Sequence, residues 1–573
     1  MKKISLFLFV LFCCVFLSVA YADGVCGANL TWTLENGTLT ISGTGDMEDW
    51  FISTPWYSET DNIQNVVIEE GCTSIGDFAF YQCGKMRSIT IPEGVTRIGD
   101  NAFDWCRELT SITIPNSVVS IGDDAFNVCS KLTSIVVPAN VTTIGDTAFG
   151  QCGSLVKIEL PEGLTSIGRS AFYSCGKLTS ITLPSTLTYI GDTVFKSCGS
   201  LTAINVAEGS ASYVAVDGVL YSKDKTTLIA YPAGKAKTSY SVPDGVTSLG
   251  NASFYGAKKL TGITLPAGLE TIGDDCFMNC QKLQRINIPE GVTTIGDTAF
   301  FYCYELTGIT FPSTLETIGD DMFESCNKMT YIDVASGNPN FVSVDGVLFN
   351  ADKTHLLYYA PGKQTPTYDV PQGVTTIGKY AFLYSKYLKQ VTFPEGLTTI
   401  DKSAFRGVDI VTLTFPSTLI TIEYNAFSSN EALTQVTIPA NVLTLGDGAF
   451  SWCDKLISVT VEGMYTDFNE WGVFDFGNDN LIIYGLEGST AQAHALEEKI
   501  TFQVITPAPT EAPSADGWTC PSCNTNMTGG KFCWECGTAK PEPPKPQTCA
   551  GCGYVVPDDM KMKFCPECGA KFE

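Results

Sequence analysis

Paired Cys-x-x-Cys motifs near the C-terminus are the residues of this 573-residue chain best suited to metal chemistry. Two such pairs bring four thiolates to one ion, which is the tetrahedral ligand set of a structural zinc site. Glycine follows the second cysteine of three pairs and asparagine that of the fourth, and both tolerate the positive φ of a tight knuckle. Since protein fills all four positions of each site, we expect two structural zinc ions and no open catalytic position. The expected ligands are Cys520, Cys523, Cys533 and Cys536 for one ion, and Cys549, Cys552, Cys565 and Cys568 for the other.

Motifs for catalysis are missing from the sequence. The only two histidines, His355 and His494, have no second ligand at the spacing of a zinc protease, and neither a nucleophile elbow nor a P-loop occurs. We therefore expect a protein that is not an enzyme.

A phenylalanine recurs with a 23-residue period through most of the chain. Self-similarity at such a period is typical of repeat proteins, in which each unit buries its apolar edge only against its neighbours. We therefore expect one elongated stack of rungs. The usual distance between neighbouring strands predicts a rod with a length on the order of 70 Å. The positions fall in blocks of six, four and four, with one step of 22 residues: Phe80, Phe103, Phe126, Phe149, Phe172, Phe195; Phe254, Phe277, Phe300, Phe323; Phe382, Phe405, Phe427, Phe450.

Residues 109–129 show what one rung is expected to form. Residues 109–114 include alternating apolar and polar side chains, which predicts a half-buried strand. Pro115 ends this strand because proline cannot donate to a ladder. Residues 118–121 predict a second short strand.

The second half of the rung is expected to turn. Gly122 allows a tight turn, and Asp123 is placed to N-cap a single helical turn that carries Ala125, Phe126 and Cys129. The predicted fold class is thus a leucine-rich-repeat-like solenoid, mainly β with one short helical turn per 23-residue rung, plus two small zinc ribbons.

Two side chains recur beside the phenylalanine, and each has two interpretations. The cysteine three residues after it would serve metal or redox chemistry, or would fill a tight corner as a small buried group, which we favour. The aspartate after the glycine would bind calcium as part of a ladder of stacked carboxylates, or would N-cap the helical turn of its own rung. Arg169, Asn251 and Lys379 interrupt the aspartate row, which favours capping.

Two insertions of equal length separate the three blocks. Each contains the text Val-Asp-Gly-Val-Leu, at residues 216–220 and 344–348, and predicts a β-hairpin with its turn near residues 223–225 or 351–353. A structural spacer is favoured over a protruding binding element.

The rung resembles the BspA-type leucine-rich repeat family, through its Leu-Thr-Ser-Ile-Thr-Ile-Pro and Ile-Gly-x-x-Ala-Phe signatures across about residues 24 to 505. This resemblance implies an exported, surface-associated protein whose relatives are discussed as adhesins. The C-terminal cysteines resemble the double zinc-ribbon modules appended to many bacterial proteins, which implies docking to protein or nucleic acid.

The N-terminus predicts export. Lys2 and Lys3 precede an apolar run over residues 4–19, and Ala-Tyr-Ala at 20–22 fits a cleavage site; a retained anchor is the alternative. No later stretch is long enough to span a membrane once the signal is cleaved. The net charge of −26 argues against nucleic acid, which needs a basic face, and favours a protein partner.

These features predict a linear domain order. It is a signal peptide (1–22), an N-terminal β-hairpin cap (23–59), a solenoid (60–460) with hairpin insertions near 207–240 and 335–368, a C-terminal cap (461–505), a linker (506–517), zinc ribbon 1 (518–538), a linker (539–547) and zinc ribbon 2 (548–573).

The function predicted is that of a secreted or cell-surface protein that mediates protein binding or adhesion through its solenoid surface. Its ligand would be a host matrix protein or an envelope protein. One alternative is an architectural part of the cell envelope, and another is a cytoplasmic zinc-ribbon scaffold with a misread N-terminus.

Overall fold

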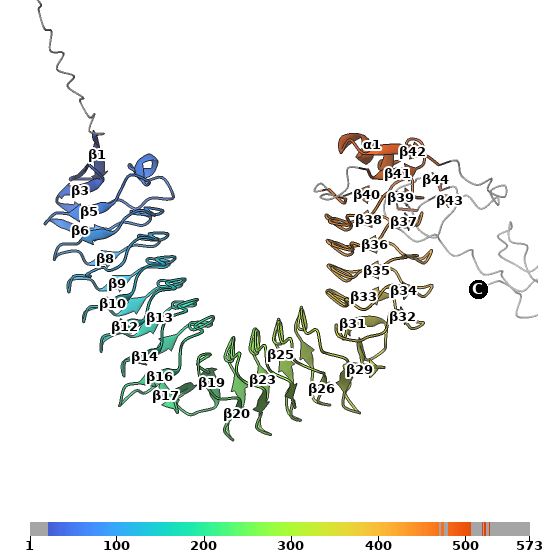
Figure 1. Ribbon diagram of the computed structural model, residues 1–573, viewed down its shortest axis with the longest axis horizontal. Helices are drawn as coiled ribbons and strands as arrows, with labels where there is room; N and C mark the ends of the chain where they lie inside the picture. Colours follow the sequence, from blue (N-terminus) through green and yellow to red (C-terminus); the bar gives the residue numbers. More distant parts are fainter. Residues whose placement is uncertain are drawn as a thin grey trace, which may run out of the picture.

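The computed structural model describes residues 21–468, 472–474, 480–505, 518–519, 521–522 and 526–527. Within these ranges the chain forms a U-shaped solenoid, with two arms joined by a shorter base (Figure 1). The expected elongated stack of rungs is present, and it bends at each of the two insertions. No helix in the described part of the chain is long and apolar enough to cross a membrane.

Three sheets, here called the inner sheets, are formed mainly by the second strand of successive rungs, and these strands pair in parallel. The hairpin strands at the start of the second and third sheets pair antiparallel. In the right arm of Figure 1, β33, β36 and β38 lie towards the inside of the U. The first inner sheet contains β4 (Gly45–Asp46), β6 (Cys72–Ile75), β8 (Arg97–Ile98), β9 (Ser120–Ile121), β11 (Thr143–Ile144), β13 (Ser166–Ile167) and β15 (Tyr189–Ile190). The second contains β17 (Tyr213–Val216), β18 (Val219–Ser222), β19 (Thr227–Ala230), β21 (Ser248–Leu249), β23 (Thr271–Ile272), β25 (Thr294–Ile295) and β27 (Thr317–Ile318). The third contains β29 (Phe341–Val344), β30 (Val347–Asn350), β31 (His355–Tyr359), β33 (Thr376–Ile377), β35 (Thr399–Ile400), β36 (Thr421–Ile422), β38 (Thr444–Leu445) and β40 (Asp467–Phe468).

The first strand of each rung lies on the outer side of the U, where β32, β34, β37 and β39 are labelled in Figure 1. These outer sheets are broken into short groups. The groups are β10 (Ser134–Val136) with β12 (Lys157–Glu159); β14 (Ser180–Leu183) with β16 (Ala203–Val206); β20 (Ser239–Ser241), β22 (Gly262–Thr264) and β24 (Arg285–Ile286); β26 (Ile309–Phe311) with β28 (Ile332–Val334); and β32 (Thr367–Asp369) with β34 (Gln390–Thr392).

Both solenoid ends carry additional strands. At the N-terminal end β1 (Tyr21–Gly27), β2 (Leu30–Glu35) and β3 (Thr38–Gly43) are antiparallel and continue into β5 (Asn65–Ile68) and β7 (Ser88–Thr90). A short 3-10 helix, Tyr57–Glu59, follows β4. At the C-terminal end β37 (Gln435–Ile438), β39 (Ser458–Val461), β41 (Ile482–Gly485) and β42 (Thr501–Val504) form one sheet, against which α1 (Thr490–Glu497) packs. The pair β43 (Trp518–Thr519) and β44 (Asn526–Met527) follows.

The repeated phenylalanines form the predicted file of neighbouring rings. Phe126 is fully buried, and its ring lies 5.1 Å from Phe103 and 5.3 Å from Phe149, nearly parallel to both. Trp56 extends the first column at its N-terminal end by stacking on Phe80. Since each ring contacts only its neighbours along the stack, the core is quasi-one-dimensional, as the period predicted.

The prediction of one helical turn per rung was wrong. Alternate backbone N–H groups of the turn donate to the next rung: Asp124 N to Asp146 O at 2.8 Å, Phe126 N to Ala148 O at 2.7 Å and Val128 N to Gly150 O at 2.9 Å. Asp124 and Val128 adopt positive φ of 52° and 56°, which an α-helix excludes. A helix would satisfy these N–H groups within one rung, whereas the observed turn uses them to hold two rungs together.

The recurrence of the glycine also has a different reason from the one predicted. A Cβ built on Gly145 would lie 2.5 Å from Asp123 N and 2.5 Å from Gly122 C, both in the preceding rung. Glycine is needed here because adjacent rungs approach closely beside the inner sheet, and not because the residue requires positive φ.

Each bend is built around a hairpin strand that two cores share. In the first insertion Leu220 of β18 belongs to the core of the first arm, whereas its neighbours Val219 and Tyr221 belong to the core of the base. In the second insertion Leu348 of β30 belongs to the base, and Val347 to the second arm. Because side chains alternate along a strand, one buried strand ends one stack and begins the next. We call these two places the first and second corners.

Candidate binding site at the first corner

The eight cysteines predicted to bind zinc lie outside the described residues, so the zinc sites remain a prediction. Among the described residues there is no cluster of three or more His, Cys, Asp or Glu side chains that could hold a metal ion. His355 is in β31 and His494 is in α1, as expected for the second hairpin and the C-terminal cap.

The repeated cysteines are buried thiols that bond the backbone. Cys129 Sγ donates to Phe103 O at 3.3 Å, and the same bond recurs along each column, for example from Cys152 to Phe126 O at 3.2 Å. Asn430 takes the position in one rung, where its Nδ2 donates to Phe405 O at 2.8 Å. Burial raises the pKa of these thiols, which opposes formation of the reactive thiolate. The arrangement agrees with the packing interpretation.

The repeated aspartates hold adjacent rungs together. Asp100 Oδ1 accepts a hydrogen bond from Asp123 N at 2.8 Å, and Asp123 Oδ1 accepts one from Asp146 N at 2.7 Å. Asn251 does the same for Asp274 N at 2.9 Å, so the role requires an acceptor oxygen and no charge. The predicted N-cap was therefore wrong in its partner: the carboxylate caps the equivalent residue of the next rung, 23 positions away.

The first corner contains a shortened rung. The chain runs from the end of β19 directly into Tyr231. The Tyr231 ring stacks on Phe254 with 5.2 Å between centroids, and Tyr231 N donates to Ser253 O at 2.7 Å. Tyr231 thus occupies the place of the repeated phenylalanine, but the turn residues that precede it in a regular rung are absent. The turns of the two flanking full rungs, around Phe195 and Phe254, are left apart.

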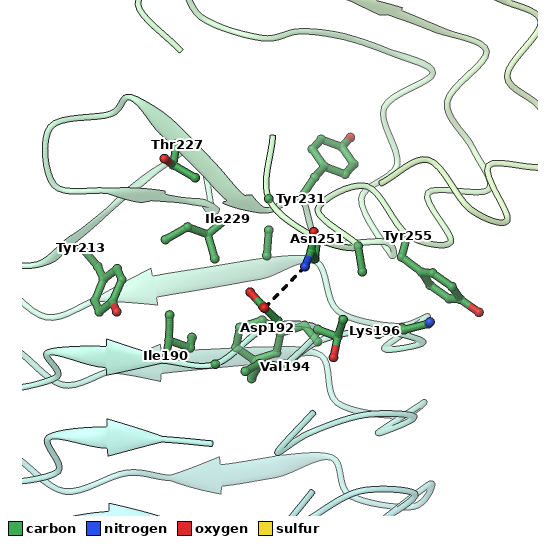
Figure 2. Close-up of a pocket in the computed structure, with 16 residues that line it drawn as sticks. Ile190, Asp192, Val194, Lys196, Tyr213, Thr227, Ile229, Tyr231, Asn251 and Tyr255 are labelled. Carbon is green, nitrogen blue, oxygen red and sulfur yellow. Dashed lines mark hydrogen bonds between the residues drawn. The ribbon is translucent and has the colours of Figure 1, made fainter. Parts of the chain in front are cut away.

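This missing turn leaves an open cavity of about 170 Å³, which we call the corner slot (Figure 2). Ile190, Val194 and Phe195 form its wall on the first arm, and Ile229 and Ala230 of the shortened rung form the opposite wall. Polar groups stand at its rim: Asp192, Thr193, Lys196 and Asn251, with Tyr213 and Tyr255 at its two ends.

Polar contacts across the slot fix its width. Asn251 Nδ2 donates to Asp192 Oδ2 at 3.4 Å, the bond drawn in Figure 2. Lys196 Nζ lies over the Tyr255 ring, 5.0 Å from the ring centroid. The same ammonium group forms an ion pair with Asp275, with 2.5 Å between Nζ and Oδ2. Lys196 and Asp275 are each about four-fifths buried, at 22 % and 19 % side-chain exposure, so solvent screens this pair less than a surface one. Sequence spacing alone could not find these contacts, because their partners lie 59 and 79 residues apart.

Most of the solenoid matches a known repeat family. Residues 51–175, 119–215, 233–350 and 361–475 match the family model described as the BspA type leucine rich repeat region (6 copies). No curated protein matches the chain at a significant level.

Solved structures of other repeat proteins are similar to the chain. A leucine-rich repeat protein from Eubacterium ventriosum has 27 % identity, a TM-score of 0.45, and covers 72 % of this chain and 95 % of its own. A leucine rich cell surface protein from Faecalibacterium prausnitzii has 28 % identity, a TM-score of 0.44 and coverage of 54 % and 94 %. The pneumococcal vaccine antigen PcpA has 19 % identity, a TM-score of 0.33 and coverage of 84 % and 98 %.

Proposed function

The chain belongs to the BspA-type leucine-rich repeat family, and on that premise we propose that it is an exported surface protein that binds a protein ligand through its solenoid. The family consists of surface proteins often involved in binding. The observation that carries the proposal is that each rung uses different side chains for packing and for its exposed surface. Apolar rings, thiols and ladder groups are used for packing, and a repeated polar surface is left for contact.

The outer sheets show this surface directly. Along β14 the exposed residues are Ser180 and Thr182, which alternate with buried Ile181 and Leu183. Along β37 the exposed residues are Gln435 and Thr437. Uncharged polar side chains of this kind offer many weak contacts to a large partner, and the net charge of −26 favours a partner with basic patches.

Two observations support binding over catalysis. The thiols of the solenoid core are buried and have raised pKa values, so they are poor nucleophiles. Asp104 and Asp321, whose pKa values burial raises to about 7, lie in the first arm and in the base, and not in one cleft.

Export and the zinc ribbons complete the proposal. The N-terminal run supports secretion, with cleavage after Ala22, and the C-terminal cysteines support two zinc ribbons that dock to another protein. N-terminal sequencing of the protein recovered outside the cell should begin at Asp23. Soluble cytoplasmic protein that retains residues 1–22 would contradict export.

Metal analysis tests the ribbons. The purified chain should contain two zinc ions, Cys520→Ser should lower this to about one, and the matched control Cys129→Ser should leave both. A wild-type chain without zinc after purification free of chelators would contradict the assignment.

A binding screen tests the function and separates it from an architectural role. The immobilised full chain is exposed to host matrix proteins and, separately, to envelope proteins of the producing cell. Saturable binding of a matrix protein supports adhesion. Capture of envelope components alone favours the architectural role, and binding of neither contradicts both.

A further inference from the structure

The second corner provides an internal template for the corner slot. The two insertions are equivalent residue by residue with an offset of 128 positions, so Tyr231 corresponds to Tyr359 and Phe195 to Phe323. Tyr359 stacks on Phe382 with 4.9 Å between centroids, just as Tyr231 stacks on Phe254. The second corner is therefore built on the same shortened rung.

Several lining residues differ between the two corners, and one of these differences places an aromatic ring in the core of the second corner. Tyr358 stands where the first corner has Ala230. The Tyr358 ring fills the second slot and leaves only about 10 Å³. Its ring meets Phe323 edge-on, with 5.4 Å between centroids and an interplanar angle of 83°, and its hydroxyl donates to Gly319 O at 2.6 Å. A phenol group thus satisfies both the apolar and the polar part of this site.

The first slot has the same parts without the phenol. Phe195 and Gly191 both line it, and they correspond to Phe323 and Gly319. Phe195 is only partly buried, whereas Phe323 is 3 % exposed. No donor to Gly191 O is present among the residues that the structure describes. Among the described residues, the first corner therefore leaves Phe195 partly exposed and Gly191 O without a hydrogen-bond donor, whereas Tyr358 covers the equivalent groups in the second corner.

We propose that the corner slot is a binding site for a phenol group, held by its ring against Phe195 and by its hydroxyl on Gly191 O. The size is suitable, since an apolar cavity of about 150 Å³ holds benzene and the slot measures about 170 Å³. This site goes beyond the protein-binding surface proposed above and does not depend on it. The phenol could come from a small free compound or from a tyrosine side chain, and the probes distinguish these sources.

Titration calorimetry of the full chain tests the proposal with p-cresol, N-acetyltyrosinamide and toluene. One saturable p-cresol site is expected, and toluene should bind several-fold more weakly because it lacks the hydroxyl. Binding of N-acetyltyrosinamide as well would identify a tyrosine side chain as the ligand, and binding of p-cresol alone would assign the slot to small phenols. Absence of saturable binding by both would overturn the proposal.

Two variants locate the site. Ala230→Tyr should fill the slot as Tyr358 does, and should weaken p-cresol binding by at least about tenfold. The control Val136→Tyr, at an outer-sheet residue that is 60 % exposed, should bind like the wild type. Tyr358→Ala should open the second slot and give two p-cresol sites, with thermal unfolding used to confirm that each variant is folded. Unchanged p-cresol binding by folded Ala230→Tyr would overturn the assignment of the site.

Discussion

Substituting Gly145 by alanine should destabilise the solenoid, whereas the same substitution at Gly153 in the same rung should not. The new Cβ at 145 would lie 2.5 Å from Asp123 N and Gly122 C, which are backbone atoms that cannot turn away. The two rungs must separate locally, and this weakens the bonds from Gly145 N to Ile121 O at 2.9 Å and from Asp146 N to Asp123 Oδ1 at 2.7 Å.

The magnitude follows from these contacts. Two hydrogen bonds contribute about 2 kcal/mol, and overpacking costs about 1–3 kcal/mol, so Gly145→Ala should lower the free energy of unfolding by about 3–5 kcal/mol. At Gly153 a Cβ would meet no atom within 4 Å, and φ is not positive. Gly153→Ala should therefore raise the free energy of unfolding by about 0.4–1 kcal/mol, because alanine restricts the unfolded chain.

Urea unfolding followed by circular dichroism measures both variants, and hydrogen exchange of residues 145 and 146 reports the local effect. Faster exchange at these two amides is expected in Gly145→Ala only. Equal unfolding free energies for the two variants would refute the explanation of the glycine column by close rung approach.

Three further predictions concern the ladders and the core. Phe126→Ala should lower the free energy of unfolding by about 3–5 kcal/mol, against a change within about 0.5 kcal/mol for Phe51→Ala, whose side chain is 82 % exposed; similar values from urea unfolding would contradict the stacked core. Asp123→Ala should lower the free energy of unfolding by about 1 kcal/mol because Asp146 N loses its acceptor, and Asp123→Asn should lower it much less because the amide oxygen can still accept. Thermal stabilisation of the wild type by millimolar calcium of 2–3 °C or more, on the order expected for about 1 kcal/mol, would instead favour the cation ladder. Burial raises the pKa of Asp104 to about 7 in the fold, so the folded state binds the proton more tightly than the unfolded chain, and the free energy of unfolding should fall as pH rises from about 4 to about 7. Asp104→Asn should therefore stabilise the protein at pH 8 more than at pH 4. An effect of the substitution on thermal unfolding that does not depend on pH would argue against this titration.

The corner slot shows the limit of reading a repeat from its sequence. The equal length and shared text of the two insertions predicted equivalent hairpins, and the structure has β17–β19 and β29–β31 at these places. The replacement of Tyr358 by Ala230 is visible in the sequence, but its meaning is not. It becomes a cavity only because the shortened rung keeps the turns around Phe195 and Phe254 apart.

Sequence by itself determined which residues are interior. Burial depends on apolar residues recurring at a fixed period, so the interior position of Phe126 could be derived from spacing alone, whereas the packing role of Cys129 was only the favoured one of two interpretations. Tertiary structure decided the partners of the polar groups. Asp123 and the turn N–H groups bond the neighbouring rung instead of their own, and position 145 requires glycine because the backbone of the neighbouring rung lies against it. These contacts form between residues about 23 positions apart, and local propensity carries no information about them until the rungs are stacked.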